Sequence, residues 1–201
     1  YDSIDKLKTS PVTVLAHFAA DYLDPVFCKE LHQLKNIKEI QQIGVSVYTI
    51  DEIKKVLSVT PPDIIQCPLN ILDTKLYRKG ILDEIKGHKI DIHIRSVFLQ
   101  GLFYLCDEDI KRSFPDALPT IERLMSISQN AGITLAELSL LWVTSLNNVD
   151  KVIIGVDSVD QLKNHIKTLN KKVDHAIFEE ALSIKYENES ILNPSLWTEN
   201  L

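Results

Sequence analysis

The chain has 201 residues, 45% of them hydrophobic and 25% charged, which is the composition of an ordinary soluble globular protein. Its net charge of −6 argues against a nucleic-acid or anionic-membrane surface, because both need clustered Lys and Arg. No apolar run approaches the roughly 18 residues that span a bilayer. Cys28, Cys67 and Cys106 lack the spacing of a metal site, so we expect reduced thiols in a cytoplasmic protein.

Apolar strands alternate with amphipathic helices along the first half of the chain. Ile4 and Leu7, followed by Pro11, have the pattern of a helix that is ending. Three strand and helix pairs come next, each strand being an apolar run and each helix having apolar residues three or four positions apart. We predict strands at 12–17, 40–48 and 63–69, and helices at 26–34, at 51–57 and over a longer stretch that ends at Lys86.

The second half begins with a strand at 90–98 and a long connection at 102–119. Phe103, Tyr104 and Phe114 in this connection fit either the wall of a substrate pocket or an ordinary apolar lid. Further helices are predicted at 120–130, at 134–146, where Thr134 and Glu137 form a capping box, and at 175–184. An apolar hook at 191–197 ends the pattern and is expected to pack on the surface.

The segment 151–165 combines three signals. Val152, Ile153 and Ile154 predict a buried strand that breaks at Gly155. Asp157 or Ser158 can then cap a helix, and Ser158 with Gln161 makes a capping box ahead of the apolar positions Leu162 and Ile166. A helix start of this kind attracts anions such as phosphate, although most capped helix starts in strand and helix pairs bind nothing.

About five strand and helix pairs predict a parallel α/β sheet covered by helices, in one domain over residues 1–201. An open doubly wound sheet and an incomplete (β/α)₈ barrel both fit this pattern. A complete barrel usually needs about 250 residues and eight strands, and this chain has fewer of both. In either architecture functional side chains gather where parallel strands end.

The polar residues at the predicted strand ends are His17, Ser46, Gln66, Arg95 with Ser96, and the turn at Gly155. Each could serve structure alone, as a helix cap, an ion pair or a partner of nearby backbone. Together they predict a ring of hydrogen-bonding groups around a ligand, because buried polar groups at several strand ends cost stability. The histidines and carboxylates have no metal-ligand spacing, and the sequence has no P-loop, nucleophile elbow or dinucleotide-binding glycine motif.

At these strand ends the sequence resembles the aldo-keto reductase superfamily, in particular its short bacterial members associated with sugar metabolism. The resemblance runs through nearly the whole chain, in the segments LAHFAADYLDP, IQQIGVSVYTIDEI, DIIQCPLNILD, HIRSVFLQGLF, GITLAELSLLWVTSLNNVDKVIIGVDSVDQLKNHI and NPSLW. It implies a (β/α)₈ barrel that transfers hydride between NADPH or NADH and an aldehyde or ketone. The chain would supply the fourth through eighth barrel units.

The resemblance also implies roles for individual residues. His17 matches the catalytic histidine that orients the substrate carbonyl, and Ser46 and Gln66 match residues that hold the nicotinamide carboxamide. Arg95, followed by Ser96, stands where a tyrosine commonly stacks on the nicotinamide ring, and a guanidinium can also lie flat on such a face. The pyrophosphate and adenosine-ribose loop is matched by Gly155, Asp157, Ser158, Gln161 and His165.

Several positions depart from the family's pattern. Val47 replaces the Asn that usually follows the serine, and Asp157, Gln161, Asn164 and His165 replace the cations and the Glu-Asn pair. Those cations normally meet a 2′-phosphate, so NADH is favoured over NADPH.

The family's Asp, proton-donating Tyr and Lys belong to upstream strands that we expect to be missing, so the chain alone is expected to be inactive. The alternative is a non-catalytic binding or scaffolding protein on a degenerate version of this fold. We expect a small carbonyl substrate, neither nucleic acid nor membrane as a partner, and a homo-oligomer that covers the open strand edges.

Overall fold

The computed structural model describes residues 2–9 and 11–197, so Tyr1 and residues 198–201 of the predicted tail lie outside the described residues. The chain divides into two compact units. Unit 1 comprises Tyr1–Cys67 and Gly80–His93, and unit 2 comprises Pro68–Lys79 and Ile94–Leu201. None of the helices in the described part of the chain is long and apolar enough to cross a membrane.

A parallel α/β sheet is the framework of the fold, as the alternation of strands and helices predicts. Its strands are β1 (Thr13–Ala16), β2 (Gln42–Ser46), β3 (Ile64–Pro68), β4 (Asp91–Arg95) and β5 (Lys151–Val152), and they follow one another in chain order. β1 and β2 pair in parallel with Ala16 opposite Val45, and β2 and β3 pair in parallel with Ser46 opposite Gln66. Parallel neighbours need crossover connections, which the intervening helices supply.

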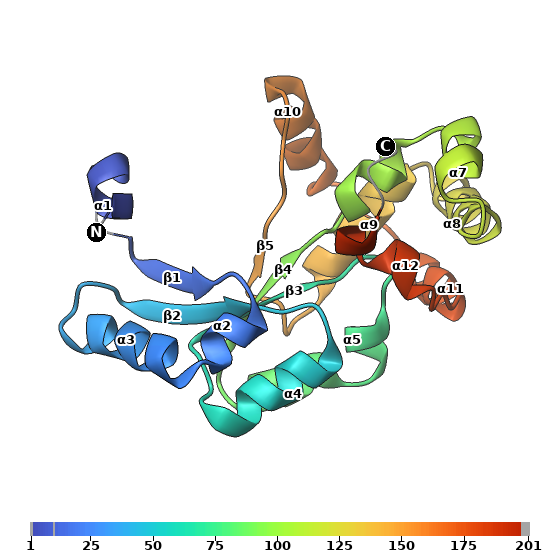
Figure 1. Cartoon of the computed structure of the whole chain (residues 1–201). Coiled ribbons are helices and arrows are strands. Elements are labelled where there is room, and N and C mark those ends of the chain that lie inside the picture. The colour runs from blue at the N-terminus through green and yellow to red at the C-terminus, as the bar shows by residue number, and fades with distance from the viewer. Residues whose placement is uncertain (1, 10, 198–201) are drawn as a thin grey trace. The chain divides into compact units, whose positions relative to one another are not determined.

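The helices of unit 1 are α1 (Asp2–Leu7), α2 (Ala19–Leu23), α3 (Pro25–Asn36), α4 (Ile50–Val59) and α6 (Ile81–Gly87). α3 begins where the Asp24 carboxylate accepts hydrogen bonds from the backbone N–H groups of Val26 and Phe27, with proline as its first residue. A reciprocal capping box between Thr49 and Glu52 begins α4. α3 and α4 lie on the same side of β1 and β2 (Figure 1).

Unit 2 is mainly helical and has its own core. Its elements are α5 (Lys75–Arg78), the 3₁₀ helix η1 (Leu99–Tyr104), α7 (Asp107–Ser113), α8 (Leu118–Asn130), α9 (Leu135–Ser145), α10 (Val159–Thr168), α11 (His175–Ser183), α12 (Glu189–Leu192) and the 3₁₀ helix η2 (Pro194–Leu196). α9 is buried on nearly all sides, as a helix with apolar residues around its whole circumference must be. The Trp197 ring packs on Phe114, and its Nε1 donates to the Ile191 carbonyl, so the predicted hook does pack on the surface.

Some element boundaries differ from the predictions. The strands end earlier than their apolar runs, because Val47, Leu69 and Val97 are buried in the loops that follow them and not in the sheet. The connection at 102–119 contains part of η1 and all of α7. The helical stretch before Lys86 is broken at Gly80, which adopts a left-handed φ of 67°.

The segment 151–165 also differs from its prediction. Ile153 is 42% exposed, so the expected buried strand is wrong at this position. β5 is the last strand in the sheet order, and the Ile153 N–H still donates to the Ile94 carbonyl, but the side chain is not covered. On α10 the apolar residues Leu162 and Ile166 are exposed, whereas His165 and Thr168 are buried. The helix therefore packs through a face that its apolar periodicity does not predict.

Candidate functional site

A cleft of about 490 Å³ lies in unit 2, where β4 and β5 end. One part of its lining comes from the segment after β4 and includes Ser96, Phe98, Gln100, Gly101 and Tyr104, and the other comes from the segment after β5 and includes Ile153, Gly155, Asp157 and Gln161. The cleft thus brings together four of the predicted site residues, Ser96, Gly155, Asp157 and Gln161. It combines aromatic rings with polar groups, which is typical of small-molecule sites.

The segment that follows β4 has an unusual backbone. Ser96, Leu99 and Gln100 all adopt positive φ, at 59°, 44° and 52°, and Gly101 has a φ of 89°. Residues other than glycine rarely adopt this conformation, and each instance costs about 1–3 kcal/mol. The segment is therefore strained at three non-glycine positions, and two of them, Ser96 and Gln100, line the cleft.

The predicted capping of α10 is confirmed in part. The Ser158 hydroxyl accepts a hydrogen bond from the Gln161 N–H at 3.1 Å, as a helix cap does. The Gln161 side chain, however, accepts from the N–H of Asp157 at 2.6 Å and not from that of Ser158. Gly155 has open space where a Cβ would stand, so the turn before α10 leaves room beside its backbone.

His165 lies on the buried face of α10 and stacks on Phe98, with ring centroids 4.8 Å apart and planes at 15°. Tyr104 also packs on Phe98, edge-on, with ring centroids 5.4 Å apart. Burial lowers the pKa of His165, so its imidazole is uncharged at neutral pH. Its Nε2 has no hydrogen-bond partner among the described residues. Burial, with the nearby charge of Glu137, raises the pKa of Tyr104 to about 12.

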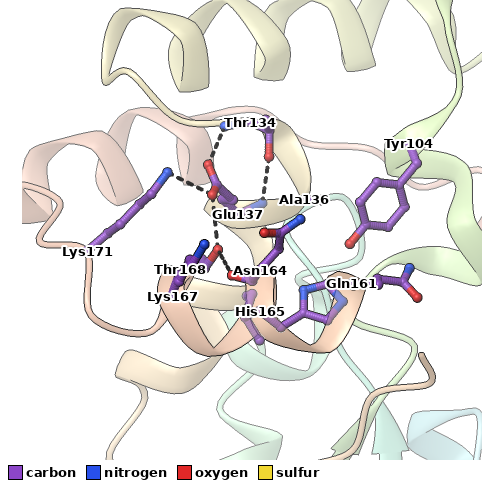
Figure 2. Close-up of a pocket in the computed structure, with 11 residues that line it drawn as sticks. Tyr104, Thr134, Ala136, Glu137, Gln161, Asn164, His165, Lys167, Thr168 and Lys171 are labelled. Atoms are coloured by element: carbon purple, nitrogen blue, oxygen red, sulfur yellow. Dashed lines mark hydrogen bonds and ion pairs between the residues drawn. The ribbon is translucent and has the colours of Figure 1, made fainter. Parts of the chain in front are cut away.

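A second cavity of about 380 Å³ lies between η1, α9 and α10, and Tyr104 and Gln161 line both cavities. The Glu137 carboxylate accepts from the Thr134 N–H at 3.0 Å, the Thr168 hydroxyl at 3.0 Å and Lys171 Nζ at 2.7 Å. Figure 2 shows this cluster on the opposite side of the cavity from Tyr104. Burial raises the pKa of Glu137, but these three hydrogen bonds outweigh it and hold that pKa below its usual value.

The remaining predicted site residues follow the strand ends as expected. In unit 1, Ser46 and Gln66 are register partners, and His17 directly follows Ala16, which pairs with Val45, so all three lie at one edge of the sheet. His17 is exposed and stacks on Phe18 at 4.5 Å. In unit 2, Arg95 ends β4, and its Nη1 donates to the Ser96 hydroxyl at 3.2 Å.

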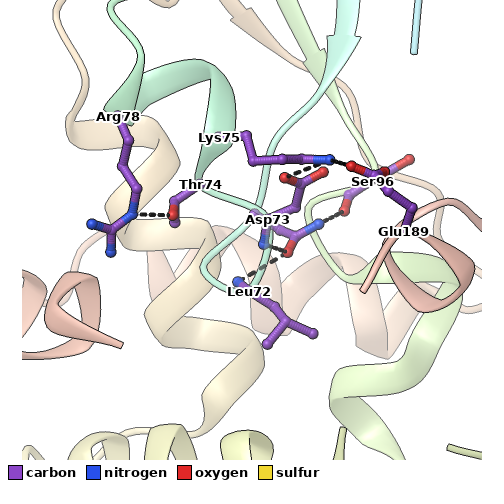
Figure 3. A network of polar contacts seen from close by, with 8 residues as sticks. Leu72, Asp73, Thr74, Lys75, Arg78, Ser96 and Glu189 are labelled. Atoms are coloured by element: carbon purple, nitrogen blue, oxygen red, sulfur yellow. Dashed lines mark hydrogen bonds and ion pairs between the residues drawn. The ribbon is translucent and has the colours of Figure 1, made fainter. Parts of the chain in front are cut away.

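Asn70 was missed by the sequence analysis. It is fully buried, and it donates from Nδ2 to the Ser96 carbonyl at 3.1 Å, while its Oδ1 accepts from the N–H groups of Leu72 and Asp73. Figure 3 shows Lys75 beside the Asp73 carboxylate and in contact with Glu189. Burial raises the pKa of Asp73 to about 6, against the opposing effect of Lys75. The signal that could have revealed Asn70 is a polar residue directly after the apolar run of β3.

The three aromatic residues of the connection 102–119 have different positions in the structure. Tyr104 lines both cavities, whereas Phe103 and Phe114 are buried and line neither. Within the described residues, no cluster of three or more His, Cys, Asp or Glu side chains could hold a metal ion.

A dehydrogenase and two aldo-keto reductases are among the solved structures that are similar to this chain. A glycerol dehydrogenase from Gluconobacter oxydans has 18% identity and a TM-score of 0.68, with 90% of this chain and 60% of that one covered. A thermostable aldo-keto reductase, solved with the inhibitor epalrestat, has 20% identity and a TM-score of 0.66, with 90% and 63% covered. The holo form of an aldo-keto reductase from Bacillus halodurans has 20% identity and a TM-score of 0.72, with 93% and 64% covered.

These likenesses confirm the fold class, that of the (β/α)₈ barrels, of which the chain has a five-stranded part. The chain spans 60–64% of the length of these three structures. A search of curated protein sequences found no match. The sequence model of the Aldo/keto reductase family matches residues 2–184, which is most of the chain, and the chain therefore belongs to the aldo/keto reductase family.

Proposed function

We propose that the chain is the cofactor-binding part of a cytoplasmic NAD(P)H-dependent oxidoreductase, which transfers hydride between the nicotinamide and an aldehyde or ketone related to sugars. The observation that carries this proposal is the cleft after β4 and β5, which joins Ser96, Gly155, Asp157 and Gln161. Family membership supports it, because aldo-keto reductases generally use NAD(P)H on carbonyl substrates.

The cleft fits a dinucleotide in its chemistry. The rings of Phe98 and Tyr104 offer apolar faces to a flat ring. Ser96, Gln161 and the open backbone at Gly155 offer hydrogen bonds to ribose and phosphate oxygens. Ser158 caps α10, whose start favours negative charge.

The charge around the cleft favours NADH over NADPH. Among the described residues, neither Lys nor Arg lines this cleft, whereas the acidic residue Asp157 does. A carboxylate can accept hydrogen bonds from ribose hydroxyls, whereas it repels a 2′-phosphate. Lys167 and Lys171 line the neighbouring cavity, and the ammonium of Lys171 is paired with Glu137.

When bound, the cofactor supplies the hydride. In this proposal His17 donates a hydrogen bond to the carbonyl oxygen of the substrate, and Ser46 and Gln66 hold the carboxamide of the nicotinamide. The guanidinium of Arg95 would lie against the nicotinamide ring, as the resemblance implies for this position. His165 stacks on the ring of Phe98 and so restricts the position of that ring. The proton for the reduced oxygen requires a further donor, for which the resemblance implies an Asp, a Tyr and a Lys that these 201 residues do not supply.

The test is to titrate the purified chain with NADH and with NADPH and to record nucleotide fluorescence and binding heat. Asp157→Arg should reverse the preference, raising NADPH affinity relative to NADH by about tenfold or more, because a guanidinium pairs with a phosphate. Asp160→Arg is the matched control, since Asp160 is an exposed carboxylate of the same helix start that lines neither cavity. Equal effects of both variants, or no nucleotide binding by the unmodified chain, would refute the proposal.

The second candidate function is a binding or scaffolding protein with a degenerate site. The observation in its favour is that Val47 is fully buried, so the position after Ser46 offers no polar group to a ligand. This function predicts that the chain binds dinucleotide without oxidising it in the presence of small aldehydes, even within a protein that contains the Asp, Tyr and Lys.

A further inference from the structure

The lining segment 96–101 of the cleft has a shape that its own sequence does not favour. Ser96, Leu99 and Gln100 hold left-handed φ values, which cost energy in a residue that has a Cβ. Such a conformation persists where the surrounding structure over-determines it. The contacts that hold this segment therefore also decide the shape of the cleft.

Those contacts extend the pairing of β3 and β4 past the ends of the two strands. After β3 and β4, the Leu69 N–H still donates to the Arg95 carbonyl at 3.2 Å. At the next position the side chain of Asn70 takes over and donates to the Ser96 carbonyl at 3.1 Å. At Ser96, where φ becomes positive, the hydrogen bond to the carbonyl therefore comes from a side-chain amide and not from a backbone N–H.

Ser139 of α9 makes the third link. Its hydroxyl donates to the Val97 carbonyl at 2.7 Å and accepts from the Ile71 N–H at 3.2 Å, so it bridges the two chain segments as a water molecule would. Ser139 and Asn70 are both fully buried. Solvent therefore cannot replace either link once it is removed, and the carbonyl and N–H groups would be left without partners.

The turn after β3 fixes the orientation of the side-chain amide of Asn70. Its Oδ1 accepts from the N–H groups of Leu72 at 3.0 Å and Asp73 at 2.8 Å, which leaves Nδ2 facing the Ser96 carbonyl. The tight turn after β3 thus determines where the carbonyl of Ser96 lies, and with it the direction of the lining that follows.

We propose that Asn70 and Ser139 are positioning residues for the nucleotide cleft, which act by holding the segment 96–101 in its left-handed conformation. The inference rests on the proposed function for its ligand, and on the hydrogen bonds alone for its effect on the segment. Neither residue lines the cleft. Their effect on affinity is therefore indirect, through the carbonyl groups of Ser96 and Val97.

The first measurement is hydrogen exchange of the backbone amides at 96–101 by mass spectrometry. Asn70→Ala and Ser139→Ala should each speed exchange in this segment, because its strained conformation loses a restraint. Ser128→Ala is the matched control: Ser128 is also buried in unit 2, but its hydroxyl bonds only to the Met125 carbonyl of its own helix. Unchanged exchange in both variants would overturn the inference, whatever the ligand.

The second measurement is the dissociation constant for NADH, which Asn70→Ala and Ser139→Ala should raise about tenfold, since small displacements of positioning groups have effects of this size. Asn70→Asp separates positioning from folding. Its oxygen can still accept from Leu72 and Asp73, but an ionised carboxylate cannot donate to Ser96. Affinity should recover as the pH is lowered from about 8 to about 5.5, where a buried carboxyl regains its proton and can donate again.

The outcomes separate the two claims. If the unmodified chain does not bind NADH, the proposed function is wrong, and the exchange experiment still decides whether Asn70 and Ser139 hold the segment. If the unmodified chain binds NADH and both alanine variants bind it equally well, the positioning role is wrong while the proposed function stands.

Discussion

Gly44 of β2 is a position where a single methyl group should disturb the sheet that carries His17, Ser46 and Gln66. A Cβ built there would stand 2.8 Å from the backbone oxygen of Ile64 and 2.9 Å from Cγ of Leu15. The first of these distances is about 0.6 Å shorter than ordinary van der Waals contact. β2 pairs with β1 on one side and β3 on the other, so it cannot move away from either neighbour.

Gly44→Ala should therefore destabilise the protein by the cost of overpacking, about 1–3 kcal/mol. For a chain of this length that corresponds to a melting temperature lower by roughly 3–10 °C. The measurement is urea and thermal unfolding followed by circular dichroism at neutral pH. Because Ser46 follows two residues later in the same strand, the variant should also weaken any ligand binding that depends on β2.

Gly87→Ala is the matched control in the same unit. A Cβ at Gly87 would meet no atom within 4 Å, and its φ is not in the left-handed region. This substitution should stabilise the protein by about 0.4–1 kcal/mol, because alanine restricts the unfolded chain. Opposite signs for the two variants are expected. Equal stability of Gly44→Ala and the unmodified protein would refute the close approach of β2 and β3.

Three further predictions concern ionisable groups, and all are measured as urea midpoints across the pH range. Glu137→Ala should cost about 2 kcal/mol at neutral pH through the lost cap and hydrogen bonds, and the cost should shrink as pH falls through the lowered pKa of Glu137, whereas the exposed Glu179→Ala should change little. His165 has a lowered pKa, so the unmodified protein should lose stability as pH falls below about 6.5, and His165→Gln should lack this slope. Asp73 has a pKa raised to about 6, so it should add stability as pH falls from there towards about 4, and Asp73→Asn should not.

The parts of the fold that the sequence predicts are those with local causes. The alternation of apolar runs and helical periodicity places β1 to β4, and the caps at Thr134 and Ser158 place the starts of α9 and α10 within one residue. Ser46 and Gln66 could be assigned to one sheet edge, because parallel strands that follow one another end at the same side.

The lining segment of the cleft could not be predicted in the same way. Glycine or asparagine is the usual sequence signal of a left-handed backbone, but here Ser96, Leu99 and Gln100 adopt this conformation. The exposure of Ile153 was equally out of reach, since an apolar run predicts a strand without saying whether another element covers it. Both features depend on contacts between residues far apart in the sequence.

The segment 96–101 is held by contacts with two helices, and this explains why its own sequence does not predict its conformation. Ser139 of α9 binds the Val97 carbonyl on one side, and His165 of α10 stacks on Phe98 on the other. His165 can stack there uncharged because burial lowers its pKa, so the contact needs no counter-ion. The residues that determine the cleft therefore include buried polar groups of the helices behind it. Substitutions of those groups should alter ligand affinity, although the groups themselves do not line the cleft.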